Sequence, residues 1–232
     1  MWYRVFKHLL IGPILWTFCR PRVVGRGQIP AQGPVIIAAN HTSFIDSLLL
    51  CLIIRRRLSF VAKSDYFDRR DRRGRLQRWF FTAVGQIPID RAGGHRSADA
   101  LDRAAGILAD GGIWAIHPEG TRCRDGRVHR GHTGVMRVAA ATHTPVIPIG
   151  LRGTARVNPP GRRMWRPHRV DIVVGRPLAP PAPVTDDGDS HELRLATDRL
   201  MAEIAVLAGQ PYADTYATRA GRNRRAVPAP GQ

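Results

Sequence analysis

Residues 40–46, Asn-His-Thr-Ser-Phe-Ile-Asp, combine an imidazole and a carboxylate at short range. His41 and Asp46 are five positions apart, so a regular helix would turn them onto different faces. They can meet if His41 precedes a helix and folds back over its first turn, where the carboxylate accepts an N–H from one ring nitrogen. The other nitrogen is then left basic, which gives a base and an orienting acid, the second half of a catalytic triad.

A nucleophile from the protein is not evident beside this pair. Ser43 is the nearest hydroxyl, and either Thr42 or Ser43 is expected to cap the helix that follows. A base without a protein nucleophile favours a reaction in which the substrate supplies the attacking hydroxyl. The alternative interpretation is that His41 is a capping or core histidine and Asp46 an ordinary acid in the first turn of a helix.

Short apolar runs place the pair on a strand-to-helix turn. Residues 35–39 are typical of a buried strand and residues 43–54 of a helix, and the same alternation continues along the chain. Further strands are expected within 22–30 and 85–91 and at 58–62, 113–116, 146–151 and 169–174, and further helices at 97–110, 134–142 and 190–208. The pattern predicts an α/β fold, a single domain with a mixed, largely parallel central sheet flanked by helices.

Polar turns follow three of these strands, at 40–46, 90–91 and 119–122. Because ligands in α/β sheets bind beyond the carboxyl ends of the strands, we expect these turns to share one rim. The rim would bring Arg91 and Arg122 near the base, with Lys63 as a further cation. Guanidinium groups close to a base fit a phosphorylated substrate. Glu119 could bind a substrate hydroxyl or hold Arg122 in place.

The 232-residue chain has 36 Lys and Arg against 18 Asp and Glu, which gives a formal net charge of +18. Such a charge attracts nucleic acid, anionic lipid surfaces or phosphorylated substrates. No recognition helix, metal finger or aromatic stacking pattern accompanies it, so a basic nucleic-acid-binding module remains only an alternative from another class. An arginine cluster at 69–78, followed by aromatic residues, indicates either a solvated face or a membrane-facing surface. Three scattered cysteines favour a reducing compartment over a disulfide framework or a zinc site.

The first 20 residues contain an apolar stretch from Leu9 to Cys19 with aromatic and basic residues near its ends. The stretch is shorter than the roughly 20 residues that a membrane span needs, and Pro13 interrupts it. It predicts a helix lying in the membrane interface, with an amphipathic helix packed on the domain as the alternative. The expected organisation is a membrane-interface anchor at 1–20, a catalytic domain at 21–210 and a basic, disordered tail at 211–232.

Four sequence blocks give the chain a specific resemblance. They are N-H-x-S-x-x-D at 40–46, G-x-I-x-I-D-R at 85–91, P-E-G-T-R at 118–122 and an apolar-Pro-apolar strand at 147–149. In this order and spacing, the chain resembles the glycerophospholipid acyltransferase family, and most of all its 1-acyl-sn-glycerol-3-phosphate (lysophosphatidic acid) acyltransferases. The chain departs from the family's F-P-E-G-T-R block at His117, which stands in place of the phenylalanine, and residues 153–168 have no counterpart that we can place.

The resemblance implies acyl transfer from acyl-CoA or acyl carrier protein to the free hydroxyl of 1-acyl-glycerol 3-phosphate, which gives phosphatidic acid. By this resemblance His41 deprotonates the hydroxyl and Asp46 orients His41. The implied substrate-binding residues are Lys63, Arg91, Glu119, Gly120, Thr121 and Arg122. Neither a metal nor any other cofactor nor a covalent acyl-enzyme is implied.

The same family leaves other acceptors open, namely another lyso-lipid, glycerol 3-phosphate or an acylated amino-acid lipid. The expected partners are the lysophospholipid acceptor, the acyl donor and an anionic membrane surface, with nucleic acid disfavoured. The expected location is the cytoplasmic face of the membrane, as a peripheral or monotopic protein. A catalytically silent scaffold is a further possibility, and the intact residues His41, Asp46, Glu119 and Arg122 argue against it.

Overall fold

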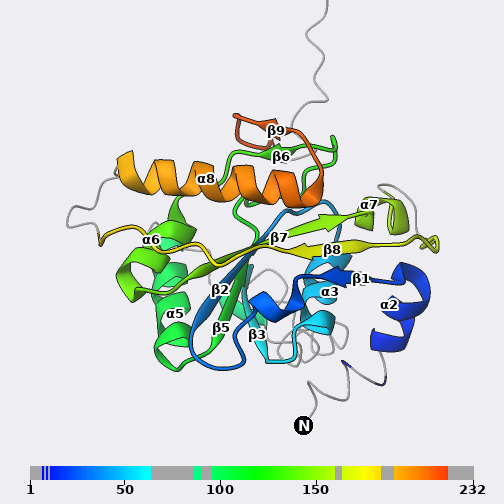
Figure 1. Cartoon of the computed structure of the whole chain (residues 1–232), viewed down its shortest axis with the longest axis horizontal. Helices are drawn as coiled ribbons and strands as arrows, with labels where there is room; N and C mark the ends of the chain where they lie inside the picture. Colours follow the sequence, from blue (N-terminus) through cyan, green and yellow to red (C-terminus); the bar gives the residue numbers. More distant parts are fainter. Residues whose placement is uncertain are drawn as a thin grey trace, which may run out of the picture.

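The sheet is the frame of the molecule. The computed structural model describes residues 7, 9, 11–63, 86–89, 96–159, 164–183 and 191–218. Within these ranges, seven strands form one sheet in the order β1-β8-β7-β2-β5-β3-β4 (Figure 1). They are β1 (Arg22–Val24), β2 (Val35–Ala39), β3 (Leu58–Lys63), β4 (Gln86–Ile89), β5 (Ile113–Ile116), β7 (Val146–Arg152) and β8 (Asp171–Val174). Neighbouring strands are parallel except for β7 and β8, which confirms the mixed, largely parallel sheet that the sequence predicts.

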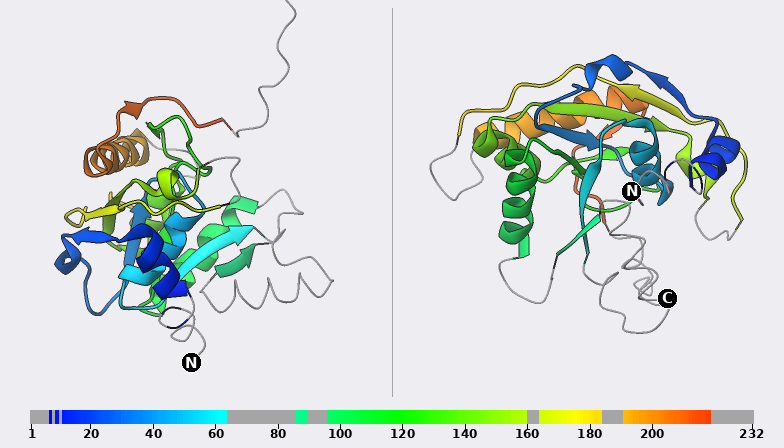
Figure 2. Two further views of the ribbon diagram at one scale, coloured as in Figure 1. Left: turned by 90° about the vertical axis from the view of Figure 1, so that its right-hand side faces the viewer. Right: turned by 90° about the horizontal axis from the view of Figure 1, so that it is seen from below.

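Helices cover both faces of this sheet, as the alternating sequence pattern predicts. They are α2 (Ile11–Cys19), α3 (Ile45–Ile53), α5 (Arg96–Ala109), α6 (Gly134–Thr142), α7 (Thr154–Val157) and α8 (His191–Ala208), with a 3-10 turn η2 (Arg26–Gln28). In Figure 2, α5 lies on one side of the strands and α2 and α3 lie on the other.

Strand β2 separates two hydrophobic cores. Val35, Ile37 and Ala39 belong to the core that includes α2 and α3, whereas Ile36 and Ala38 belong to the core beneath α5, α6 and α8. All five side chains are fully buried. A continuous apolar run is what a parallel strand covered on both faces requires, and it fixes the position at which the chain leaves the sheet towards residues 40–46.

Parallel pairing brings several strand ends to one edge of the sheet. Ala38 in β2 is level with Ile116 in β5, and Ala39 is level with Ile149 in β7. The turns at 40–46 and 119–122 therefore leave the same rim, as expected from the sequence. The third expected turn, 90–91, lies outside the described residues.

A second, two-stranded sheet closes over the segment after β5. It pairs β6 (Val128–His129) in parallel with β9 (Tyr212–Ala213), close to α8 (Figure 1). Arg130 N–H donates to the carbonyl of Thr215 (3.1 Å), and the Arg130 guanidinium lies 3.5 Å from the Asp214 carboxylate and 5.5 Å from the centre of the Tyr216 ring. Residues 211–216, which the sequence analysis assigned to a disordered tail, thus contact the segment at 128–130.

Helix α2 is packed on the domain by one face and exposes the other. Leu15 and Cys19 are fully buried, whereas Ile14 and Trp16 are 50% and 54% exposed, and Leu9, just before the helix, is 71% exposed. Within the described ranges, the helices are all too short or too polar to cross a bilayer. The helix therefore belongs to the fold and also presents large apolar side chains to the outside.

Candidate active site

His41 and Asp46 meet at the carboxyl end of β2, in the arrangement that their spacing predicts. The Nδ1 atom of His41 lies 3.0 Å from Oδ2 of Asp46. The same oxygen accepts the backbone N–H groups of Thr42 and Ser43, each at 2.7 Å. Because this carboxylate acts as an acceptor, Nδ1 carries its hydrogen and Nε2 keeps its lone pair. Asp46 is fully buried, but the His41 side chain is 19% exposed, so the ring can be reached from outside.

The first turn of α3 is stabilised differently from the prediction. The helix begins at Ile45, two residues later than expected, and no side-chain hydrogen bond caps it from Phe44. Thr42 Oγ1 lies 2.8 Å from Thr154 Oγ1, and Ser43 Oγ is buried without a hydrogen-bond partner in the described part of the chain. The predicted hydroxyl cap is therefore wrong. The Asp46 carboxylate instead accepts the N–H groups of Thr42 and Ser43, which precede the helix, because a carboxylate is a strong acceptor for backbone N–H groups.

Glu119 ties two segments of the rim together. Its Oε2 accepts the backbone N–H of His41 (2.8 Å) and its Oε1 accepts that of His129 (2.9 Å). A third bond, from Cys123 N–H to the carbonyl of His41 (2.7 Å), joins the segment just after Glu119 to the His41 turn. Glu119 is only 2% exposed, and burial raises its pKa. These contacts hold the backbone of His41 in place, and they run to His129 rather than to Arg122.

The P-E-G-T-R turn carries three of the expected substrate-binding residues, Gly120, Thr121 and Arg122, and the Cys123 N–H that follows joins it to the His41 turn. Gly120 has a φ of 70°, and a Cβ atom there would lie 3.1 Å from the His132 ring, so a glycine fits this position. Thr121 is partly buried and Arg122 is exposed. The Cys123 thiol is buried, and its burial raises the pKa of that thiol, which makes it a poor nucleophile.

Asn40 and Thr154 are supporting residues whose roles sequence reasoning missed. The Asn40 side chain is fully buried, donates to the carbonyl of Leu151 (2.9 Å) and to Oε1 of Gln210 (3.1 Å), and accepts the Leu151 N–H (2.8 Å). It thereby anchors the His41 turn to β7. Thr154, which contacts Thr42, lies in the segment 153–168 that the motifs left unplaced. The only signal for it was its position just after a strand that ends at the same rim.

The other predicted cations are placed only in part. Lys63 is the last residue of β3, where its backbone is level with Ile89 of β4 at the same edge of the sheet. Arg91 and the arginine cluster at 69–78 lie outside the described residues. The described part of the site therefore brings together the His41–Asp46 pair, Glu119 and the turn that carries Arg122.

A family model described as Acyltransferase matches residues 20–152, which include β2, the His41 turn and the P-E-G-T-R turn. The chain belongs to the acyltransferase family. This result confirms the resemblance that the four sequence blocks indicate.

Relatives of the acyltransferase domain carry one consistent name. The chain is 28% identical over 166 residues to the chloroplastic 1-acyl-sn-glycerol-3-phosphate acyltransferase LPAT1 of Arabidopsis thaliana, covering 71% of this chain and 45% of that protein. A 1-acyl-sn-glycerol-3-phosphate acyltransferase of Chlamydomonas reinhardtii is 31% identical, over 70% of this chain and 48% of its own length. The chain thus spans about half the length of these relatives.

A solved structure of the same family has a similar fold. The crystal structure of the 1-acyl-sn-glycerophosphate acyltransferase PlsC from Thermotoga maritima matches with a TM-score of 0.67 and 25% sequence identity. The match covers 88% of this chain and 79% of that one. It extends beyond the family-model match and supports the α/β architecture over most of the chain.

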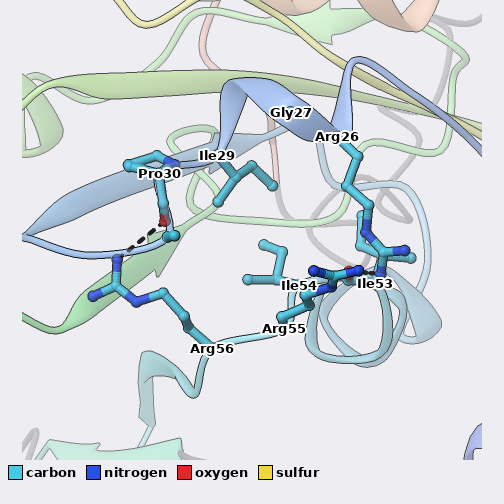
Figure 3. Close-up of a pocket in the computed structure, with 9 residues that line it drawn as sticks. Arg26, Gly27, Ile29, Pro30, Ile53, Ile54, Arg55 and Arg56 are labelled. Atoms are coloured by element: carbon cyan, nitrogen blue, oxygen red, sulfur yellow. Dashed lines mark hydrogen bonds between the residues drawn. The ribbon is translucent and has the colours of Figure 1, made fainter.

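One pocket of the acyltransferase domain lies away from the predicted site (Figure 3). Its volume is about 400 Å³, and its wall includes Ile53 and Ile54 at the carboxyl end of α3. Asp46, in the first turn of that helix, is about 10 Å away along the axis at 1.5 Å per residue. Arg26 donates to the carbonyl of Ile53, and Arg56 donates to those of Pro30 (3.3 Å) and Gly111 (2.6 Å). Among the residues that the structure describes, these arginines donate to backbone carbonyls of Ile53, Pro30 and Gly111 and not to a predicted site residue.

Proposed function

We propose that this acyltransferase moves an acyl chain from acyl-CoA or acyl carrier protein to the free hydroxyl of 1-acyl-glycerol 3-phosphate. The observation that carries the proposal is the 3.0 Å contact between His41 Nδ1 and the buried Asp46 carboxylate, with the His41 ring partly exposed. In the described part of the chain, the side chains that bond to or stack on the His41 ring are those of Asp46 and His117. Neither is a hydroxyl or thiol, so the attacking oxygen belongs to the acceptor.

The reaction balances with these groups. His41 Nε2 takes the proton of the acceptor hydroxyl while its oxygen attacks the thioester carbonyl of the donor. The C–O bond forms and the C–S bond breaks, and the departing thiolate receives the proton from His41. Asp46 holds the ring and stabilises the imidazolium between these two proton transfers. The products are phosphatidic acid and the free thiol of the carrier.

Arg122 is the described residue best placed to bind the acceptor phosphate. It is exposed and precedes Cys123, whose N–H is bonded to the carbonyl of His41. A guanidinium group matches two oxygens of a phosphate in a forked contact. Lys63 and Arg91 are proposed as further phosphate ligands, and Glu119, Gly120 and Thr121 as the wall of the acceptor site.

Replacement of Arg122 by alanine is expected to raise the KM for 1-acyl-glycerol 3-phosphate by about 10- to 100-fold, because a hydrogen bond to a charged group contributes about 1.5–3 kcal/mol. The value of kcat should change much less. Steady-state kinetics at varied acceptor concentration measure both constants. The control is Arg57→Ala, which removes the same charge at an exposed position before β3, at the opposite end of that strand from the rim. A fall in kcat at unaltered KM would contradict the binding role.

The choice of acceptor is tested with a panel of substrates and one labelled acyl donor at a time. We expect labelled phosphatidic acid from 1-acyl-glycerol 3-phosphate, and comparison of acyl-CoA with acyl carrier protein identifies the donor. Preferred transfer to another lyso-lipid, glycerol 3-phosphate or an acylated amino-acid lipid would show that the protein is an acyltransferase of the same family with a different acceptor. Absence of transfer together with tight, strongly salt-dependent DNA binding would support the nucleic-acid alternative instead.

Docking of the protein on an anionic membrane is also part of the proposal. Ile14 and Trp16 give the outer side of α2 an apolar surface, with Leu9 exposed just before the helix, on a chain whose net charge is +18. An amphipathic helix of this kind inserts its apolar face into the headgroup region while basic residues attract anionic lipid. The acceptor and product are themselves membrane lipids. We therefore place the acyltransferase peripherally on the membrane, at its cytoplasmic face.

The double variant Ile14→Glu, Trp16→Glu is expected to bind anionic vesicles at least tenfold more weakly, because burying one large apolar side chain contributes about 1.5–3 kcal/mol. The side chains of both residues are exposed, so the fold should survive the substitutions. Deleting the helix would also remove the buried Leu15 and could unfold the domain. Co-sedimentation with vesicles measures binding. The control is Val206→Glu, which adds a charge at a 74% exposed position on another helix, α8. Equal binding by all three proteins would exclude α2 as the docking surface.

A further inference from the structure

The His41 ring lies on a second imidazole. His117, at the position where the family's third block has phenylalanine, stacks on it with ring centres 4.1 Å apart and planes inclined by 10°. His117 directly follows β5, and β5 pairs in parallel with β2, so the sheet sets the two rings side by side. Phe60 in β3 lies next to His117 with ring centres 5.9 Å apart.

Hydrogen bonds fix the His117 ring on both of its nitrogens. Nδ1 lies 2.9 Å from the carbonyl oxygen of Ala39, and Nε2 lies 3.1 Å from Ser47 Oγ. A carbonyl can only accept, so Nδ1 carries the hydrogen, and Nε2 accepts the hydrogen of the Ser47 hydroxyl. Burial, and after it the neighbouring His41, lower the pKa of His117 to about 3. His117 is therefore neutral at physiological pH, with no donor or acceptor left for substrate.

One bond to Asp46 does not fix the His41 ring completely. The contact through Nδ1 sets the position of that atom, but the ring can still tilt about it and swing Nε2 away from the acceptor hydroxyl. A flat ring stacked 4.1 Å away removes this freedom. Because the His117 ring is held from both β2 and α3, its plane follows the same elements that carry His41 and Asp46.

We infer that His117 is a positioning residue that fixes the plane of the His41 imidazole through ring stacking and is itself held by Ala39 and Ser47. This inference rests on the proposed function, in which His41 Nε2 takes the proton of the acceptor. A neutral ring suits the task because His41 becomes a cation during the reaction. The face of a neutral aromatic ring attracts a cation, whereas a second imidazolium would repel it.

Three substitutions of His117 separate the flat ring from its bulk and from its hydrogen bonds. His117→Phe keeps a flat ring, His117→Leu keeps apolar volume without a ring, and His117→Ala keeps neither. We expect the Leu and Ala variants to lose about 10- to 100-fold in kcat, the scale of a misplacement near 1 Å, at a nearly unchanged acceptor KM. The kcat of the Phe variant should stay within about threefold of the parent value, because a flat ring still holds the His41 plane and a small change in its tilt lowers kcat far less than a 1 Å misplacement.

The pH profile of kcat/KM tests whether His117 itself exchanges a proton in the reaction, whereas the loss in kcat at a nearly unchanged KM is the change that a packing role would not produce. Since His117 is neutral, the Phe variant should show the same ionisation steps between about pH 5 and 9 as the parent, because only a group with a pKa in that range titrates there. Thermal unfolding of each variant checks its fold. If the Ala variant does not fold, the Phe and Leu pair still decides, because both are apolar side chains of similar bulk.

Several results would overturn the inference. They are equal kcat values for the Phe and Leu variants, an unaffected Ala variant, or loss of an ionisation step in the Phe variant. His41→Ala is measured in the same series. If the His41→Ala variant keeps its activity, His41 is not the base and that part of the proposed function is wrong. If it loses activity while His117→Ala does not, only the positioning role of His117 is refuted.

Discussion

Replacing His41 by alanine is expected to lower kcat/KM for acyl transfer by about 10²–10⁴, the usual contribution of a general base. The side chain supplies the only basic nitrogen that Asp46 orients in the described site. The backbone of residue 41 keeps its bonds to Glu119 and Cys123 after the substitution, so the fold should persist. Transfer of a labelled acyl chain to 1-acyl-glycerol 3-phosphate measures the loss.

The matched control for this experiment is another histidine in the domain. His143 is exposed and follows α6 in a left-handed conformation, with a φ of 50°, where its N–H is bonded to carbonyls of Ala139 and Ala140. His143→Asn accepts that backbone conformation and should retain full transfer. Thermal unfolding of both variants separates lost chemistry from lost structure. Normal turnover by a purified, folded His41→Ala protein would remove this histidine from the mechanism.

Asp46→Asn is expected to lower kcat by about 10²–10⁴ while leaving the protein folded, because the orienting acid of such a pair sets the tautomer and stabilises the imidazolium. The amide oxygen of asparagine can take the place of Oδ2 and still accept the N–H groups of Thr42 and Ser43. The NH₂ group then occupies the place of Oδ1, which has no partner in the described structure. The main change is loss of the negative charge beside the His41 ring.

Comparison with Asp46→Ala makes this second experiment decisive. Alanine leaves the two backbone N–H groups without their acceptor inside the domain, so it should also lower the free energy of unfolding by about 1–3 kcal/mol. Denaturant titration and acyl transfer are measured for both variants, with Asp99→Asn, an exposed acid in the first turn of α5, as the control. An asparagine variant as active as the parent would contradict the need for a charged orienting group.

The fold was predictable because its sheet is buried on both faces. The five apolar residues of 35–39 could not form a solvent-exposed strand, and their alternation between two cores follows from the period of a strand. The meeting of His41 and Asp46 was predictable for a related reason. A spacing of five residues excludes contact within a helix and leaves a fold-back over its first turn as the way for the side chains to touch.

Contacts made by single polar atoms were not predictable from the sequence. Thr42, Ser43 and Asp46 are all reasonable acceptors at the start of a helix, and only three-dimensional geometry shows that the carboxylate is used. The role of Glu119 depends on His129, which lies across a loop. Strand β9 is two residues long and carries no periodic pattern. Its pairing depends on a distant strand, so composition alone assigned it to the tail.

The pairing of β6 with β9 has a consequence for the time at which the site is completed during translation. His129, whose N–H is bonded to Glu119, also contacts the carbonyl of Thr215, 86 residues later in the chain. While residue 215 is still inside the ribosome, the loop that carries His129 lacks this support. Helix α2, by contrast, precedes both strands in the chain and emerges before them. With the proposed docking through α2, a nascent chain would reach a lipid surface well before the proposed base, His41, is locked in place.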